Sequence, residues 1–98
     1  MGKYLVLWEV DQTKVPISPQ ERGTGWGALT DMVKEDLKKG LSKDWGAFVG
    51  EINGYAVMDG TEVEIGNALQ RYVPWVIFKV KQIASVKQVD EIIKALTK

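Results

Sequence analysis

Residues 45–58 read WGAFVGEINGYAVM, two short apolar runs separated by Glu51-Ile52-Asn53-Gly54. The runs over residues 45–50 and 55–58 are rich in aromatic and β-branched side chains, which favour strands. Asn-Gly between apolar runs is the strongest short-range signal for a hairpin turn, because both residues accept a positive φ. The stretch therefore predicts two antiparallel strands adjacent in sequence, and the rest of the fold is arranged around this pair.

A helix is predicted before the pair of strands. Ser18-Pro19-Gln20-Glu21 is a helix-start signal, since the Ser18 hydroxyl can accept from the Glu21 amide and proline suits the first helical position. Gly40 suits the C-cap. The glycines at positions 23, 25 and 27 weaken the first two turns, each by about 1 kcal/mol relative to alanine. Apolar spacing marks the buried stripe as Arg22, Trp26, Leu29, Val33 and Leu37.

A second helix is predicted after the pair. Thr61-Glu62-Val63-Glu64 has the pattern of a capping box, in which the threonine and the second glutamate bond to each other's backbone amides. Pro74 closes this region, because proline cannot continue a helix. The residues that share the apolar face of this helix are Ile65, Ala68, Leu69 and Tyr72.

Residues 3–10 and 75–82 are predicted to be the first and the fourth strands along the chain, and Ser85-Val86-Lys87-Gln88 is a third capping signal that opens a terminal helix. The order of elements is then β-α-β-β-α-β plus one helix. This is the ferredoxin-like plan, an α+β fold in which helices cover one face of an antiparallel four-stranded sheet. We expect residues 1–98 to form a single domain of this kind.

The predicted sheet has large apolar side chains on both faces. Along residues 3–10, Tyr4, Val6 and Trp8 alternate with Leu5 and Leu7. Leaving four or five such side chains in water forfeits roughly 1.5–3 kcal/mol each, which is comparable to the stability of a small domain. We therefore expect a homodimer that packs sheet against sheet about a two-fold axis. The alternative is a monomer whose terminal helix folds across the second face.

Composition excludes several kinds of site. The 98 residues include 13 basic and 13 acidic side chains, no histidine and no cysteine. A chain without these two residue types cannot build a Ser-His-Asp triad, a thiol nucleophile or an ordinary zinc site. We expect no metal and no cofactor. The zero net charge argues against a nucleic-acid-binding surface and against a polybasic membrane patch.

Targeting signals are also absent from the pattern. No apolar run approaches the roughly 18–20 residues of a membrane-spanning helix. Charged Glu9 and Asp11 follow the short apolar run from Tyr4 to Trp8, which is unlike a secretory signal. We expect a cytoplasmic protein with no membrane partner and no nucleic-acid partner.

With this plan, the chain resembles the dimeric α/β-barrel superfamily, in which two ferredoxin-like subunits pack their sheets face to face. The resemblance rests on the first strand, on the glycine-rich hairpin over residues 50–55, and on a last strand followed by a helix from Phe78 onward. It implies a homodimer. Members of the superfamily include cofactor-free quinol monooxygenases, haem-degrading monooxygenases, muconolactone isomerases and amino-acid-sensing domains. Haem-degrading members hold iron through a histidine, which this sequence lacks.

Two other families with the same plan fit less well. Acylphosphatases resemble the chain in length, but they carry a glycine-rich phosphate loop with an arginine after the first strand. Residues 10–15 contain neither residue type. RNA-recognition domains carry stacking aromatic residues on the third strand, whereas Trp45 and Phe48 lie on the second and point to opposite faces.

Aromatic residues are the main candidates for a binding site. Four tryptophans in 98 residues exceed ordinary usage, which is on the order of one per hundred. Trp8, Trp26, Trp45 and Trp75 can line a ligand pocket between sheet and helices, because such pockets are mostly apolar. The alternative is that they fill the core and a dimer interface.

Charged residues supply fewer candidates. Arg22 and Arg71 are the two arginines, and either can clamp a carboxylate or phosphate, although an ion pair is the commoner role. Arg22 shares the helix stripe and is placed to meet Glu9 or Asp11. Glu9 is expected to be shielded after Trp8, which would suit it to general-base work. The acidic and basic residues of positions 31–39 are interpreted as a solvated helix face.

Three functions remain open at this point. The first is a dimer that binds a small apolar or aromatic molecule beside the sheet, in a cavity between the two packed sheets. The tentative ligand-binding residues are Tyr4, Trp8, Glu9, Arg22, Trp26, Trp45 and Trp75. The second is a cofactor-free monooxygenase-like or isomerase-like enzyme in the same cavity, with Glu9 or Tyr4 near the substrate. The third is a structural or partner-binding protein with a filled interior.

Overall fold

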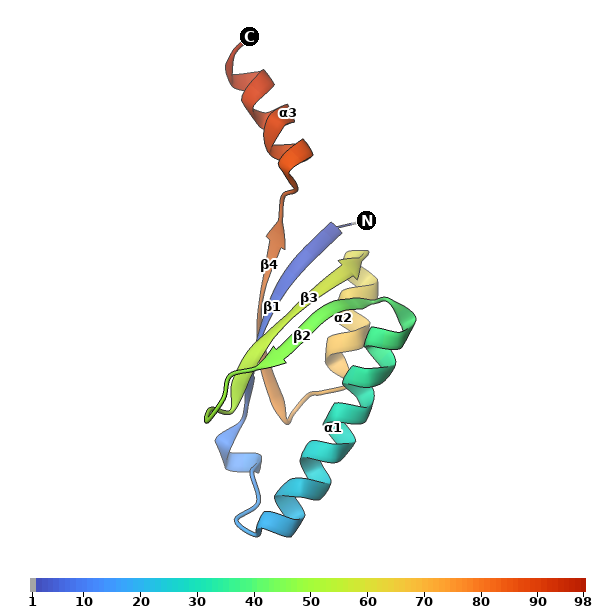
Figure 1. The fold of residues 1–98 in the computed structure, drawn as a ribbon, viewed down its shortest axis with the longest axis vertical. Helices are drawn as coiled ribbons and strands as arrows, with labels where there is room; N and C mark the ends of the chain where they lie inside the picture. Colours follow the sequence, from blue (N-terminus) through green and yellow to red (C-terminus); the bar gives the residue numbers. More distant parts are fainter. Residues whose placement is uncertain (1) are drawn as a thin grey trace.

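The computed structural model describes residues 2–98 and confirms the ferredoxin-like α+β fold. The strands form one antiparallel sheet in the order β2-β3-β1-β4, with α1 and α2 on one side of it (Figure 1). The elements are β1 (Gly2–Val10), the short 3-10 helix η1 (Gln12–Lys14), α1 (Pro19–Lys39), β2 (Ser42–Ala47), β3 (Asn53–Gly60), α2 (Glu62–Gln70), β4 (Val76–Ile83) and α3 (Val86–Leu96).

All three predicted helix-start signals are confirmed. Ser18, Thr61 and Ser85 each accept a hydrogen bond from the backbone amide three residues later. At α2 and α3 the reciprocal side-chain bond is also made, which completes both capping boxes. Gly40 ends α1 with a φ of 80°, in the left-handed region where glycine is unstrained.

The predicted hairpin turn is wrong in position. β2 ends at Ala47, and Asn53-Gly54 lies inside β3 instead of at the turn. The connection uses residues 48–52, with Gly50 at a φ of 81°. Packing explains the shift, because a Cβ on Gly54 would overlap the Gly46 carbonyl oxygen and lie 2.5 Å from Cζ2 of Trp8. Gly54 is therefore required beneath the Trp8 ring, and this contact overrides the local preference of Asn-Gly for a turn.

The helix-facing side of the sheet carries the core. Val6 lies at its centre with 1% of its surface exposed. Ile65 and Ala68 of α2 pack on it, and Val33 of α1 belongs to a second cluster near the start of β4. The strand residues buried on this side are Tyr4, Val6, Val10, Ala56, Met58 and Val76.

The opposite side of the sheet is uncovered in the single chain, and we call it the open face. Its residues are Lys3, Leu5, Leu7 and Glu9 of β1, Asp44 and Gly46 of β2, Asn53, Tyr55, Val57 and Asp59 of β3, and Ile77, Lys79, Lys81 and Ile83 of β4. Ile77 has 54% of its surface exposed. The prediction of large apolar residues on both faces is thus confirmed.

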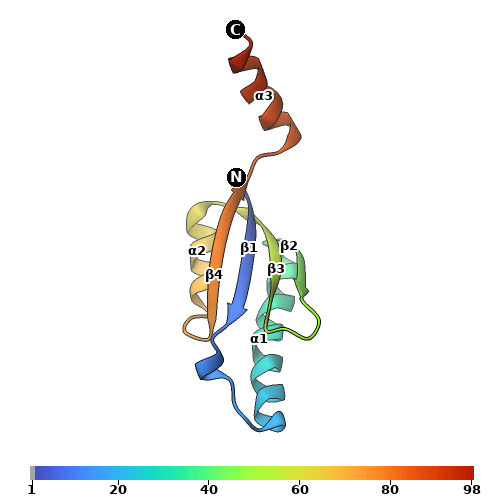
Figure 2. The same ribbon diagram turned by 90° about the vertical axis from the view of Figure 1, so that its left-hand side faces the viewer.

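The terminal helix α3 does not fold across the open face. Figures 1 and 2 show it beyond the end of the sheet, where it extends the molecule to 61 Å along its longest axis. Its apolar stripe has no cover in the described residues, since Val86 and Leu96 are each 79% exposed. Within residues 2–98, no helix is both long and apolar enough to cross a membrane.

Candidate functional site

A cavity of about 300 Å³ lies between the sheet and α1. Its walls come from the carboxyl half of β1, the β2–β3 hairpin, residues 26–36 of α1, the end of α2 and the start of β4. Most of the lining atoms belong to apolar side chains, which is the usual composition of a small-molecule pocket. The cavity lies on the helix side of the sheet, so a ligand there would not touch the open face.

Two stacked tryptophans form one wall of the cavity. The rings of Trp8 and Trp45 lie 5.3 Å apart between centroids and are tilted by only 6°. Trp8 Nε1 donates to the Tyr55 carbonyl at 3.2 Å, which satisfies its one polar group. Gly54 leaves the space that this indole fills. The wall is therefore a fixed flat aromatic surface against which a planar ligand can stack.

Trp26 supplies the facing wall from α1. It is half-buried, and the neighbouring glycines at positions 23, 25 and 27 lie in open space, since a Cβ added to any of them would meet no atom within 4 Å. The Thr30 hydroxyl donates to the Trp26 carbonyl at 2.6 Å. This turn of the helix thus places a large ring at the cavity while its other side stays open to solvent.

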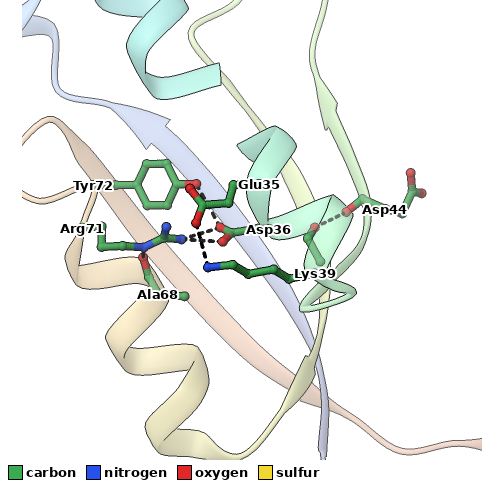
Figure 3. Close-up of polar contacts among 8 residues, drawn as sticks. Glu35, Asp36, Lys39, Asp44, Ala68, Arg71 and Tyr72 are labelled. Carbon is green, nitrogen blue, oxygen red and sulfur yellow. Dashed lines mark hydrogen bonds and ion pairs between the residues drawn. The ribbon is translucent and has the colours of Figure 1, made fainter. Parts of the chain in front are cut away.

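A buried carboxylate closes one side of the cavity. Asp36 of α1 is 4% exposed, and Arg71 Nη2 donates to both of its oxygens at 2.6 and 2.5 Å (Figure 3). The Tyr72 hydroxyl donates to the same carboxylate at 3.1 Å. Arg71 Nε donates to the Ala68 carbonyl at 3.0 Å, which fixes the guanidinium plane. This network joins α1 to the end of α2.

The network changes the chemistry of the tyrosine. Burial of the phenol, and then the charge of Asp36, raise the pKa of Tyr72 far above its usual value of 10. Tyr72 therefore stays protonated and acts as a hydrogen-bond donor. With three donated hydrogen bonds, the Asp36 carboxylate is engaged in holding the fold. The arrangement is suited to binding an apolar molecule.

No cluster of three or more acidic side chains is close enough to hold a metal ion in the part of the chain that the structure describes. The cavity itself offers two carboxylates on its lining, Asp36 and Glu51. Asp36 is already paired with Arg71.

Three of the seven predicted site residues meet in the cavity: Trp8, Trp26 and Trp45 line it together. Tyr4 is buried in the core near α2. Trp75, just before β4, is 47% exposed and lies outside the lining.

Glu9 and Arg22 also lie outside the cavity. Glu9 is exposed in the single chain, contrary to the prediction that it is shielded, because its place on β1 belongs to the open face, opposite to the side on which the helices pack. Arg22 donates to the carbonyls of Pro16 and Ile17 and holds the segment before α1. It forms no ion pair with Glu9 or Asp11 in residues 2–98.

The prediction of a solvated face over positions 31–39 is wrong for Asp36. Asp36 follows Val33 by three residues and takes the buried place that the stripe had given to Leu37, which is 41% exposed. The sequence did contain one signal for this, an arginine at position 71 beside Tyr72. Spacing alone could not reveal the partnership, because Asp36 and Arg71 are 35 residues apart.

Comparison with known proteins adds no family to this description. No protein-family model matches the sequence, and no curated protein matches it significantly.

Proposed function

We propose that the protein binds a small apolar or aromatic molecule in the cavity between the sheet and α1. The observation that carries this proposal is the cavity of about 300 Å³ with Trp8, Trp26 and Trp45 on its walls. Fixed aromatic walls with few polar groups favour planar apolar ligands, because burial of apolar surface drives such binding. Asp36 and Tyr72 lie on the polar side of the cavity, and the hydrogen bond between them joins α1 to the segment after α2.

The binding proposal is tested by isothermal titration calorimetry with 2-naphthol, a planar aromatic probe. Leu29 lines the cavity, so Leu29→Trp should fill it and weaken binding by at least about tenfold. Leu37→Trp makes the same kind of change eight residues along α1, where the side chain is exposed, and should leave affinity unchanged. Circular dichroism verifies that both variants fold. Equal affinity in both variants would contradict the proposed site.

The proposal also includes a homodimer of the dimeric α/β-barrel type, with the open faces of two copies packed together. Its support is the exposed apolar surface of that face, which includes Ile77 at 54% exposure. Covering such residues is favourable by roughly 1.5–3 kcal/mol for each fully buried side chain. Sedimentation equilibrium at tens of micromolar should report two copies, and a monomer at that concentration would refute the dimer.

No specific observation favours the enzyme hypothesis. The two residues considered for chemistry, Glu9 and Tyr4, both lie outside the cavity lining.

A further inference from the structure

The open face is patterned in charge as well as in hydrophobicity. Lys79 and Lys81 lie on β4 at one edge of the sheet, and Lys3 lies beside them on β1. Asp59 lies on β3, and Asp44 on β2 at the other edge. None of these five forms an ion pair within residues 2–98. Apart from Glu9 on β1, one half of the face thus offers cations and the other half carboxylates. Asp44 accepts hydrogen bonds from the Tyr55 hydroxyl and the Trp45 amide but has no cationic partner in the described residues.

Strand register places these residues in rows across the sheet. One row runs through Asp59, Lys3 and Ile83, and the next through Asp44, Val57, Leu5 and Lys81. The third runs through Gly46, Tyr55, Leu7 and Lys79. The second and third rows are both apolar at the centre. The second has a charge at each edge, and the third has only Lys79.

Two copies can bring their open faces together about either of two in-plane two-fold axes. An axis parallel to the strands, between β1 and β3, keeps each row opposite itself and reverses the strand order. Then Lys81 of one copy lies opposite the partner's Asp44, and Lys3 opposite the partner's Asp59. The apolar residues also match, because Leu5 then faces the partner's Val57.

The other axis runs across the strands and places β4 over β4. If this axis passes between the rows of Leu5 and Leu7, Lys81 lies opposite the partner's Lys79 twice in the dimer, and Lys3 lies opposite the partner's Glu9. This axis therefore sets two like-charge contacts against two opposite-charge contacts, whereas the axis parallel to the strands gives four opposite-charge contacts. Packed sheets are rotated by about 30°, which displaces residues at the edge by only a few ångströms, within the reach of a lysine side chain. Like charges that face each other across an interface are unfavourable, whereas opposite charges select the register.

We infer that the second copy docks about the axis parallel to the strands, with Lys81 paired to Asp44 and Lys3 to Asp59 across the interface. This inference rests on the proposed dimer and specifies its geometry. Both β4 strands then finish at the same end of the dimer, so both α3 helices project from that end.

Because both α3 helices project from the same end of the dimer, each can pack against the other. Its apolar stripe includes Val86, Val89, Ile93 and Leu96, which are between 42% and 79% exposed in the single chain. Figure 1 shows α3 leaning toward the side of the sheet away from α1 and α2, which is the side that the second copy occupies. The two α3 helices therefore pack on each other across the axis, and their polar faces remain in water.

The first test is a charge reversal measured as the dimer dissociation constant by sedimentation equilibrium in low salt. Lys81→Glu places a carboxylate opposite Asp44 at two symmetric contacts and should weaken the dimer about tenfold. Asp44→Lys combined with Lys81→Glu restores opposite charges and should return the constant to near the wild-type value. Lys38→Glu, the same charge change on exposed α1, should have no effect.

The across-strand axis predicts the opposite sign, because the carboxylate that Lys81→Glu introduces would then face Lys79 and tighten the dimer. A tighter dimer, or one unchanged by Lys81→Glu, would overturn the inferred axis while leaving the proposed dimer intact. A wild-type monomer would instead refute the proposed dimer itself. Circular dichroism of each variant verifies that the chain is folded.

A second measurement locates α3. The sequence has no cysteine, so Lys87→Cys on the polar side of α3 gives one spin-label site in each copy. Double electron–electron resonance should report a separation of about 20 Å between the two spin labels for the axis parallel to the strands. Helices at opposite ends would give about 40 Å or more, which would overturn the inference.

Discussion

Replacement of Arg71 by methionine tests the buried network beside the cavity most strictly. Met keeps much of the apolar stem and removes the guanidinium. Asp36 then loses both contacts to Arg71 and keeps only the hydrogen bond from Tyr72, while it remains 4% exposed. A carboxylate in that position has little access to water that could replace the lost donors, so Arg71→Met should destabilise the fold.

The loss in the free energy of unfolding depends on how deeply Asp36 and Arg71 are each buried. Removing one partner of a buried ion pair costs about 3–5 kcal/mol. The side chain of Asp36 is 6% exposed and that of Arg71 34% exposed, so water reaches one end of the pair. We therefore expect the lower limit, about 3 kcal/mol, which lowers the melting temperature of a domain of this size by about 12–24 °C.

The reverse change should cost less. Asp36→Asn removes the charge but keeps an oxygen for the Tyr72 hydroxyl, and it leaves Arg71 partly in water, so the cost should be about 1 kcal/mol. In the Asp36→Asn background, Arg71→Met should also lower the free energy of unfolding by only about 1 kcal/mol, because no buried charge is left without a partner. The asymmetry between the two single variants is the signature of a carboxylate that is more buried than its partner.

Urea denaturation followed by circular dichroism at one fixed protein concentration measures the wild type, both single variants and the double variant. Glu35→Gln is the matched control, since Glu35 is on the same helix and pairs at 2.7 Å with the exposed Lys39. It should leave the midpoint unchanged. Equal costs of Arg71→Met in the two backgrounds would refute the reasoning, as would a larger cost for Asp36→Asn than for Arg71→Met.

Two further predictions concern pH and glycine. Because the pKa of Tyr72 is raised by burial and by a nearby carboxylate, the unfolded chain loses the tyrosine proton first above about pH 10. The free energy of unfolding should then fall with rising pH by up to about 1.4 kcal/mol per unit, and Tyr72→Phe should remove that part of the slope in denaturation curves between about pH 9 and 11. Gly54→Ala should lower the free energy of unfolding by about 2 kcal/mol, since its Cβ would overlap both the Gly46 carbonyl oxygen and the Trp8 ring. Gly66→Ala in the open interior of α2 should instead raise it by about 0.5–1 kcal/mol, and thermal melts of both variants check the contrast in sign.

The parts of the fold that depend on local chemistry were predictable. The capping signals at Ser18, Thr61 and Ser85 each gave a helix start at the correct residue, because a cap is a contact within four residues. Alternation along residues 3–10 gave the two faces of β1, since side chains in a strand alternate strictly.

The errors arose where distant contacts decided the outcome. Asn53-Gly54 has the local chemistry of a turn, yet the Trp8 ring, which comes from another strand, requires Gly54 within β3. The sequence pattern predicts Asp36 to be a solvated carboxylate, whereas Arg71 and Tyr72 donate hydrogen bonds to it in the fold. Both partners are remote in sequence, so periodicity contains no information about them.

For the candidate site, too, some residues could be predicted from the sequence and others could not. Trp8, Trp26 and Trp45 are proposed as pocket residues because the chain is rich in tryptophan, and the same argument also proposes Trp75. Glu9 failed because its place on β1 was judged from its neighbour Trp8, although adjacent residues in a strand point to opposite sides. Trp75 precedes β4 and lies outside the cavity, a position that depends on where the strand begins.

The most direct test of the binding proposal is a two-dimensional ¹⁵N–¹H spectrum of the four tryptophan indoles during titration with 2-naphthol. Each indole N–H gives one resonance, and single Trp→Phe variants assign them. The proposal predicts concentration-dependent shifts for Trp8, Trp26 and Trp45, which line the cavity, and a stationary resonance for Trp75, which does not. A spectrum in which Trp75 alone moves, or in which no indole responds at saturating probe, would contradict it.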